Sequence, residues 1–249
     1  MNQMNKKAIN TAYAGRLGAF ALAAAALSGC ASTSNNPNDP LEGFNRTMFS
    51  FNDTVDKVAL KPAAQAYDTV VPTPVQHGVG NFFGNIGDVW SSINQLLQGR
   101  IEQGVSTFMR VAINTTFGLG GVLDVATEAR LPREKSDFGQ TLGKWGVGSG
   151  PYVVLPFFGP STVRDTAGMP VDLYGDLWTY KRPVRWRNVG AVVRIVDRRA
   201  QLLDASTLLE DAALDKYDFV RDAYLQRRQS QINGASSSGG EQKEEAIKP

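Results

Sequence analysis

The sequence predicts an all-α protein, and three observations support this fold class. Apolar residues recur at spacings of three and four along most of the chain, which is the period of a helix with one apolar face. Regular two-residue alternation over five or more positions, the pattern of a half-buried strand, is hard to find. Glycine and proline separate the helical stretches. With 249 residues the chain is long enough to bury one sizeable core.

Residues 1–29 have the layout of an export signal. Three basic residues precede an apolar run of 11 residues from Leu17 to Leu27, and small residues follow it. A membrane-spanning helix needs about 20 apolar residues, so this run is too short to span a bilayer. We therefore predict that residues 1–29 are cleaved as a signal peptide.

Cys30 is the predicted site of lipid attachment. The run Leu27–Cys30 (LSGC) resembles the bacterial lipobox, at which the cysteine receives S-diacylglycerol and N-acyl groups such as palmitate. The alternative is an ordinary signal peptide with a chance cysteine. Each buried CH2 contributes about 0.8 kcal/mol, so several acyl chains anchor a protein stably where one does not. By resemblance to lipoproteins of enteric-type bacteria, Ala31 rather than aspartate favours the outer membrane.

Composition excludes several classes of function. A single cysteine cannot form a disulfide within the chain, and a single histidine, His77, argues against most zinc sites. Removing the three basic residues of the signal changes the formal net charge from +2 to −1, which argues against a nucleic-acid partner. No G-x-S-x-G motif occurs. We expect no catalytic residue, no metal and no cofactor apart from the lipid on Cys30 and a transported phospholipid.

The helical body is predicted to run from residue 39 to residue 232. A polar tether at 30–38 precedes it, and a Gly/Ser-rich, charged tail at 233–249 follows it and is expected to be disordered. The first helix is expected to begin at Asp39-Pro40, a cap followed by proline, with Glu42 completing a capping box. It is expected to end at Lys61-Pro62.

This first helix has two contrasting faces. Its apolar stripe consists of Leu41, Phe44, Met48, Phe51, Val55 and Val58. The opposite face carries Arg46, Ser50, Asp53 and Lys57. Such a polar face meets either solvent or the interior of a channel, and the sequence does not choose between them.

Further helices follow in order. A cap and proline at Thr73-Pro74 lead into a glycine-punctuated segment, and Gly99 and the cluster Gly118, Gly120 and Gly121 end two more helices. Their apolar stripes are Val89, Ile93, Leu96 and Leu97 in the first and Ile101, Val105, Phe108 and Ala112 in the second. A short helix is expected at 138–145, and two longer ones at about 184–204 and 207–231.

The segment 146–160 is unusually apolar for a loop. Its central residues are Tyr152, Val153, Val154, Leu155, Pro156, Phe157 and Phe158, and glycine or proline brackets both ends. Pro156 prevents a continuous helix because it lacks the N–H group and clashes with the preceding turn. The segment is either an extended part of the core or a hairpin that faces a membrane or a ligand.

A basic segment begins just before the predicted helix at about 184–204 and continues along it. Arg182, Arg185 and Arg187 surround Trp186, and Arg194, Arg198 and Arg199 follow. The segment is either a solvated helix face or a surface that contacts lipid headgroups or a carrier protein. Amphipathic aromatic residues such as Trp186 favour a lipid–water boundary, and each basic residue near an anionic membrane contributes about 1 kcal/mol of attraction.

Several long blocks, in order, resemble the MlaA family of outer-membrane lipoproteins, also called VacJ. The blocks lie at Asp39–Asp53 (DPLEGFNRTMFSFND), Gly80–Gly99, Phe108–Ala126, Asp137–Asp165, Arg199–Ser206 and Tyr217–Arg228. Together they cover nearly all of residues 39–232.

The resemblance implies a ring of amphipathic helices that lies in the periplasmic leaflet around an amphipathic channel. It also implies removal of mislocalised phospholipids from the outer leaflet, delivery to the periplasmic carrier MlaC, association with porin trimers of the OmpC/OmpF type, and no catalytic residues. Two alternatives are a structural lipoprotein that assists porin assembly and a phospholipase.

Overall fold

The computed structural model describes residues 39–234. Cys30, the signal peptide, the tether and residues 235–249 lie outside the described residues, and the statements made about them above stay predictions.

Helices dominate the fold, which confirms the predicted class, and a single two-stranded hairpin is present in the described part. The elements are α2 (Glu42–Val55), the π-helix η1 (Asp56–Leu60), α3 (Lys61–Val70), α4 (Thr73–Leu97), α5 (Ile101–Thr116), α6 (Val125–Glu128), α7 (Phe138–Lys144), β1 (Tyr152–Leu155), β2 (Gly159–Thr162), α8 (Val163–Gly175), the 3-10 helix η2 (Leu177–Tyr180), α9 (Val184–Ala200), α10 (Leu203–Ala212) and α11 (Lys216–Asn233).

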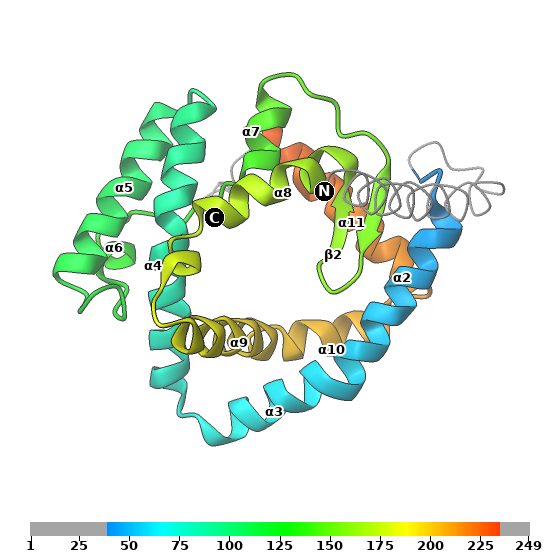
Figure 1. Ribbon diagram of the computed structural model, residues 1–249, viewed down its shortest axis with the longest axis horizontal. Helices are drawn as coiled ribbons and strands as arrows, with labels where there is room; N and C mark the ends of the chain where they lie inside the picture. Colours follow the sequence, from blue (N-terminus) through cyan, green and yellow to red (C-terminus); the bar gives the residue numbers. More distant parts are fainter. Residues whose placement is uncertain (1–38, 235–249) are drawn as a thin grey trace, which may run out of the picture.

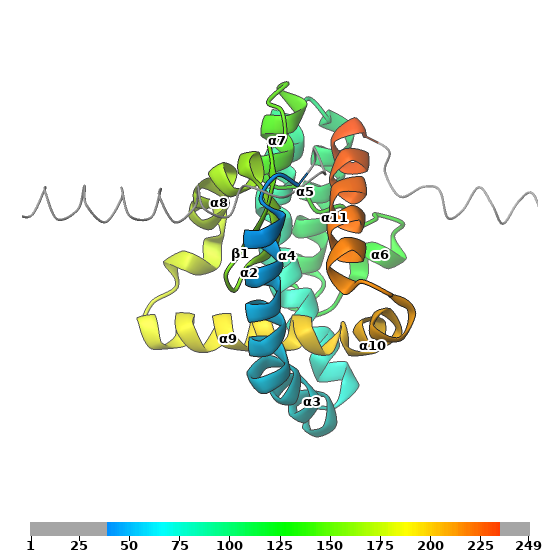
Figure 2. The ribbon, with the colours of Figure 1, turned by 90° about the vertical axis from the view of Figure 1, so that its right-hand side faces the viewer.

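The helices are arranged as a ring (Figure 1). Helix α2 forms one side, α3 runs along the bottom toward α4, and α4 forms the opposite side with α5 packed outside it. Helices α7 and α8 and the hairpin close the ring above, and α9 and α10 run below the opening. Seen from the side, α8 and the beginning of α9 project in one direction, while α6, α10 and α11 lie in the other (Figure 2).

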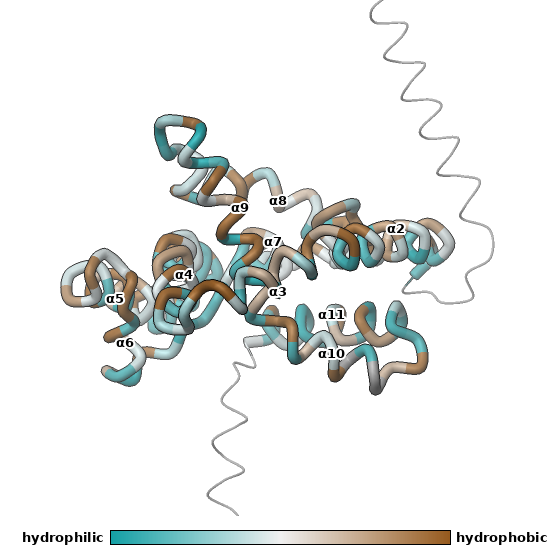
Figure 3. Tube along the Cα trace, turned by 90° about the horizontal axis from the view of Figure 1, so that it is seen from below, coloured by the Kyte–Doolittle hydropathy of each residue, from teal (hydrophilic) through white to brown (hydrophobic). Residues whose placement is uncertain are grey.

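Polar and apolar residues alternate along the helices (Figure 3). None of the helices within residues 39–234 is both long enough and apolar enough to cross a bilayer.

The first helix differs from the prediction at both ends. Asp39 does not cap it: its buried carboxylate accepts a hydrogen bond from Asn45 Nδ2 at 2.7 Å and another from the hydroxyl of Tyr217, so it is not available to the helix start. Helix α2 begins at Glu42 without a side-chain cap. Nor does Pro62 end the helix. One π-helical turn, η1, precedes it, and Pro62 lies in the first turn of α3, where a missing N–H group costs little.

Three helices occupy the C-terminal region in place of the two predicted. The prediction missed the break before α11, which Asp215 explains. Its side chain accepts hydrogen bonds from the backbone N–H groups of Tyr217 and Asp218, as an N-cap does. An aspartate inside an otherwise helical pattern was therefore a start signal.

Helix α2 holds the hairpin through two asparagines. Asn45 donates to Tyr152 O at 3.0 Å and accepts from Val154 N at 2.8 Å. Asn52 donates to Leu155 O at 2.9 Å and accepts from Phe157 N at 2.8 Å. Seven helical residues rise about 10.5 Å, close to the length of three strand residues, so the spacing of the two amides matches the strand. The amides satisfy the open edge of β1.

An aromatic core lies where α2, the hairpin and α11 meet. Tyr152, Val154 and Tyr217 are buried there, and Met48 and Phe49 of α2 pack against them. The rings of Phe49 and Tyr217 meet edge to face with centroids 5.6 Å apart. This core fixes the hairpin at the inner margin of the ring.

Candidate functional site

The outer surface of α4 and α5 is apolar. Exposed side chains on these helices and the following loop include Ile93, Leu96, Leu97, Ile101, Val105, Phe108, Met109, Phe117 and Leu119. The side chain of Phe108 is 60% exposed. Most of these residues belong to the apolar stripes from which the two helices were predicted. The stripes are therefore present, but they face outward rather than toward a core.

The opposite faces of α4 and α5 are polar and buried. Arg110, which is fully buried, lies between Asp88 and Asp124 and donates to Thr127 Oγ1 at 2.9 Å and to Leu131 O at 2.6 Å. Ser92 Oγ donates to Gly104 O at 2.8 Å, which joins the two helices directly. Further buried polar residues on this face are Ser91, Asn94, Gln95, Thr107 and Asn114.

This distribution is inverted relative to a protein surrounded by water. Soluble monomers rarely expose a contiguous apolar patch larger than about 300–600 Å². A helix that lies in a membrane leaflet turns its apolar face toward acyl chains, and its backbone groups are satisfied by its own hydrogen bonds. The α4–α5 surface is chemically suited to that environment.

The hairpin combines both predicted alternatives for the segment 152–158. Tyr152 and Val154 are 0% exposed and belong to the core, so the prediction that they face a membrane is corrected. They alternate with Val153 and Leu155, which are half-buried. The exposed tip consists of Pro156, Phe157 and Phe158, and Phe157 is 73% exposed. The ring centroids of Phe157 and Phe51 lie 5.3 Å apart. Period-two alternation explains why one segment serves both purposes.

The predicted polar face of α2 meets the beginning of α11. Arg46 forms ion pairs with Asp215 and Asp218 at 2.8 and 3.1 Å, and its guanidinium lies 4.4 Å from the ring centre of Tyr217. Asp53 pairs with Lys216 and with Lys57. Ser50 and Lys57 are exposed. The structure thus gives Arg46 and Asp53 protein partners, while a channel-lining role for this face stays a prediction.

The basic segment divides into an outer and an inner part. Arg182, Arg185 and Trp186 are exposed at the beginning of α9, which protrudes from the ring (Figures 2 and 3). The Arg185 guanidinium lies 5.0 Å from the ring centre of Trp186. Arg187 is half-buried and turns toward a cavity. Contact of this basic segment with a lipid headgroup or a carrier stays a prediction.

The cavity lies between η2, the end of α8 and the inner face of α9. Its volume is about 490 Å3. Apolar side chains form much of its wall, among them Leu60, Leu173, Trp178, Ile195 and Leu202. Four arginines and one aspartate supply its charged groups: Arg187, Arg194, Arg198, Arg199 and Asp176. The cavity is therefore amphipathic, with an excess of positive charge.

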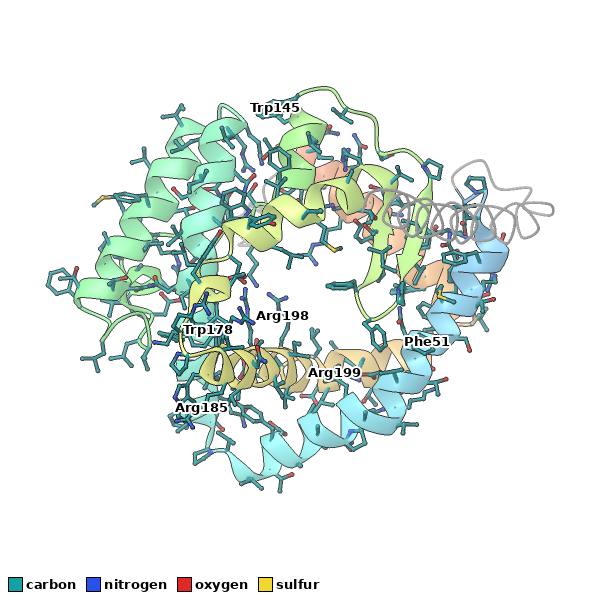
Figure 4. All side chains as sticks on the ribbon, viewed as in Figure 1. Phe51, Trp145, Trp178, Arg185, Arg198 and Arg199 are labelled. Carbon is teal, nitrogen blue, oxygen red and sulfur yellow. The ribbon has the colours of Figure 1, made fainter. Side chains whose placement is uncertain are left out.

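Arg198 is distinguished from two of the other arginines by its lack of an ion-pair partner. Arg194 pairs with Asp176, and Arg199 binds both carboxylate oxygens of Asp56, at 2.7 and 2.9 Å. Arg198 forms no ion pair with any residue between 39 and 234, and it projects from α9 into the opening of the ring (Figure 4). Desolvation by the surrounding protein and, next, the charge of Arg194 lower the pKa of Arg198, and the charges of Asp176 and Asp197 oppose this only in part.

The cavity was not predicted as a site, although the spacing of its arginines is visible in the sequence. Arg187, Arg194 and Arg198 are separated by seven and four residues, which places them on one face of a helix. What the sequence lacks is any sign that Leu60 and Trp178 complete the wall, because tertiary packing alone brings them to α9. Among residues 39–234, no group of three or more His, Cys, Asp or Glu side chains is arranged to hold a metal ion.

Comparison with known proteins agrees with these features. The model of the MlaA lipoprotein family matches residues 37–231, which is most of the chain. The chain belongs to the MlaA lipoprotein family. The match includes α2, the hairpin and α9, and so contains every element of the site described above.

MlaA relatives of known name match over most of their length. The intermembrane phospholipid transport system lipoprotein MlaA of Shigella flexneri is 42% identical over 230 residues, which are 88% of this chain and 89% of the relative. The Haemophilus influenzae protein of the same name is 38% identical over 228 residues, with coverages of 85% and 88%.

A solved MlaA-like structure, from work on the structural basis for maintenance of bacterial outer membrane lipid asymmetry, superposes with a TM-score of 0.68. The two sequences are 42% identical, and the superposition covers 78% of this chain and 98% of the solved chain.

Proposed function

We propose that this MlaA-family protein is a non-enzymatic lipoprotein of the outer membrane that removes mislocalised phospholipids from the outer leaflet. The phospholipids pass through an amphipathic channel to a periplasmic carrier of the MlaC type, which maintains the lipid asymmetry of the membrane. The names of the relatives, which place them in an intermembrane phospholipid transport system, support the class of substrate.

The observation that carries the proposal is the inverted polarity of the ring. Apolar side chains cover the outside of α4 and α5, whereas a basic, partly apolar cavity opens on the inside at α9. A phospholipid that leaves a bilayer needs a polar path for its headgroup and apolar contacts for its acyl chains. A ring of helices lying in one leaflet supplies both without crossing the membrane.

Two further parts of the proposal concern placement. The lipid predicted on Cys30 would keep the ring at the membrane surface. A porin trimer of the OmpC/OmpF type would be the protein partner, and the apolar surface of α4 and α5 offers area for either acyl chains or such a partner. The polar face Arg46, Ser50, Asp53 and Lys57 stays a candidate for the channel wall, most of all at the exposed Ser50 and Lys57.

The test is a deletion strain complemented with the wild-type chain. Phospholipid amines on the cell surface are labelled with a membrane-impermeant reagent, and porin trimers are measured in the same cells. We expect the deletion to raise surface-exposed phospholipid several-fold with normal porin trimers, and the wild-type chain to reverse it. Loss of porin trimers without surface phospholipid would instead support a role in porin assembly. Lysophospholipid released by the purified protein from labelled phospholipid would contradict the non-enzymatic function.

A further inference from the structure

We propose that the cavity between η2 and α9 binds the phosphate of an anionic phospholipid, with Arg198 and Arg187 as its phosphate-binding residues. The inference deepens the proposed transport function and rests on it. It assigns a class of headgroup to a defined position inside the ring.

The size and lining of the cavity fit a headgroup with the first part of its acyl chains. Its volume of about 490 Å3 lies within the usual range for small-molecule sites, about 300–1,000 Å3. Leu173, Trp178 and Ile195 provide an apolar wall beside the arginines. A free phosphate ion would gain nothing from that wall, whereas the glycerol and upper acyl groups of a phospholipid would be removed from water there.

The charges of the cavity are only partly compensated. Asp176 forms an ion pair with Arg194 and accepts a hydrogen bond from the backbone N–H of Trp178. Arg199 donates a hydrogen bond to Asp56. Within residues 39–234, the Arg187 side chain makes only long hydrogen bonds of 3.4 Å, to Asn188 Oδ1 and Thr179 O. Arg198 has no ion pair within the described residues. Two guanidinium groups with unused donors therefore face one space, which suits a phosphate because guanidinium binds it in a bidentate manner.

The excess positive charge of the cavity disfavours a cationic headgroup. Arg187, Arg194, Arg198 and Arg199 line the cavity, and the one carboxylate in its lining, Asp176, is already paired with Arg194. The ammonium group of a zwitterionic headgroup would therefore meet cations without a free carboxylate to receive it.

The arrangement therefore predicts a preference for phosphatidylglycerol over phosphatidylethanolamine. Both lipids offer the arginines the same phosphate, so the discrimination comes from the ammonium group of phosphatidylethanolamine, whose repulsion by an unpaired guanidinium in a partly apolar cavity should weaken binding at least about tenfold. The preference should depend on Arg198 and not on basic residues elsewhere. Arg185 is the matched control, because it lies on the same helix and is exposed, as Arg198 is, but does not line the cavity.

The experiment measures lipid binding to the purified full chain in detergent by native mass spectrometry. Phosphatidylglycerol and phosphatidylethanolamine with identical acyl chains are compared on the wild type, R198Q, R198K and R185Q. We expect at least about tenfold tighter binding of phosphatidylglycerol by the wild type and by R185Q, because neither relieves the repulsion of the ammonium group. R198Q should lose that preference, and R198K should restore part of it. Thermal unfolding in the same detergent verifies that each variant is folded.

Three outcomes would overturn the proposal: equal affinity of the wild type for the two lipids, an unchanged preference in R198Q, or loss of preference in R185Q as well. Competition with glycerol phosphate separates the two sources of phosphate, since a free phosphate that displaces the lipid at equal concentration would contradict the lipid site. The transport function is tested separately. If the wild type clears surface phospholipid in cells while R198Q binds phosphatidylglycerol normally, transport stands and this site is wrong.

Discussion

The α4–α5 pair and the junction of α2, the hairpin and α11 are built on opposite principles. Between α4 and α5 the buried side chains are polar and the exposed ones are apolar. At the junction an aromatic and aliphatic cluster is buried, with Asp39 and Asn45 satisfied by hydrogen bonds beside it, and ion pairs such as Arg46–Asp215 lie nearer the surface. The junction is organised like the core of a water-soluble protein. The α4–α5 pair is organised for an apolar surrounding, which indicates that different parts of the ring meet different solvents.

The difference also shows where specificity of packing comes from. In a leaflet, apolar contact between helices gains little over contact with acyl chains, so hydrogen bonds and ion pairs must define how α4 meets α5. Arg110 alone contacts Asp88, Asp124, Thr127 and Leu131. At the junction, water drives the aromatic side chains together, and the polar groups serve mainly to satisfy the strand edge.

The largest expected effect comes from removing the arginine that joins α4 to α5. Arg110→Met removes one cation from the buried carboxylate of Asp88, which keeps Arg133, and removes the ion-pair partner of Asp124, so we expect a loss of about 3 kcal/mol of unfolding free energy. Denaturant unfolding in detergent, followed by circular dichroism, measures it. Lys57→Met is the control, because the Lys57 side chain is 57% exposed and its pair with Asp53 should contribute no more than about 1 kcal/mol. Similar losses in both variants would contradict the special role of the buried network.

A smaller, pH-dependent effect is expected near the junction at Asp165. Burial acts to raise the pKa of this carboxyl, but the hydrogen bond and charge of Arg228 outweigh it and hold the pKa below its ordinary value of 3.8. The ionised form therefore stabilises the fold above pH 3.8, and this contribution is lost as the pH falls through the lowered pKa. Asp165→Asn should cost about 1.5–3 kcal/mol at pH 7 and progressively less below pH 3.8.

Unfolding free energies of the wild type and Asp165→Asn at several pH values test this dependence. Asp222→Asn is the control, because its side chain is 56% exposed. A difference between Asp165→Asn and the wild type that stays constant from pH 7 to pH 3 would show that the charge of Asp165 is not the cause.

The smallest effect is expected at Tyr152, in the core of the junction. Its buried hydroxyl has no hydrogen-bond partner among the described residues, so Tyr152→Phe should change stability by less than about 0.5 kcal/mol. Tyr217→Phe removes the hydroxyl that donates to the buried carboxylate of Asp39 and should cost about 1–3 kcal/mol. The two substitutions delete the same atom from neighbouring rings, and equal costs would mean that packing rather than hydrogen bonding decides both.

The sequence was sufficient to predict the helices but not which of their faces is buried. Ile101, Val105 and Phe108 correctly indicated α5 by their spacing, because a helical period is the same in water and in lipid. Their outward orientation depends on the solvent, which periodicity does not report. The predicted ends of α2 were wrong for a different reason. Asp39 binds Asn45 instead of capping the helix, and a π-helical turn before Pro62 lets the helix continue.

The candidate site was predictable only along a single helix. Arg187 was singled out from the sequence, and the spacing of Arg194 and Arg198 would have placed them beside it. The cavity also needs Leu60 and Trp178 from distant segments, and whether Arg198 or Arg199 is paired depends on where Asp56 comes to lie. Those contacts exist only in the folded ring.

The central claim is that the outer face of α4 and α5 contacts acyl chains, and fluorescence quenching tests it most directly. A thiol-reactive fluorophore is attached to Phe108→Cys or, for comparison, to Asp222→Cys on α11, with Cys30 retained because its sulfur is expected to be acylated. The protein is reconstituted in vesicles whose lipids carry bromine on the acyl chains. We predict strong quenching at position 108 and little at position 222. Weak quenching at both positions, with the protein bound to the vesicles, would contradict the account.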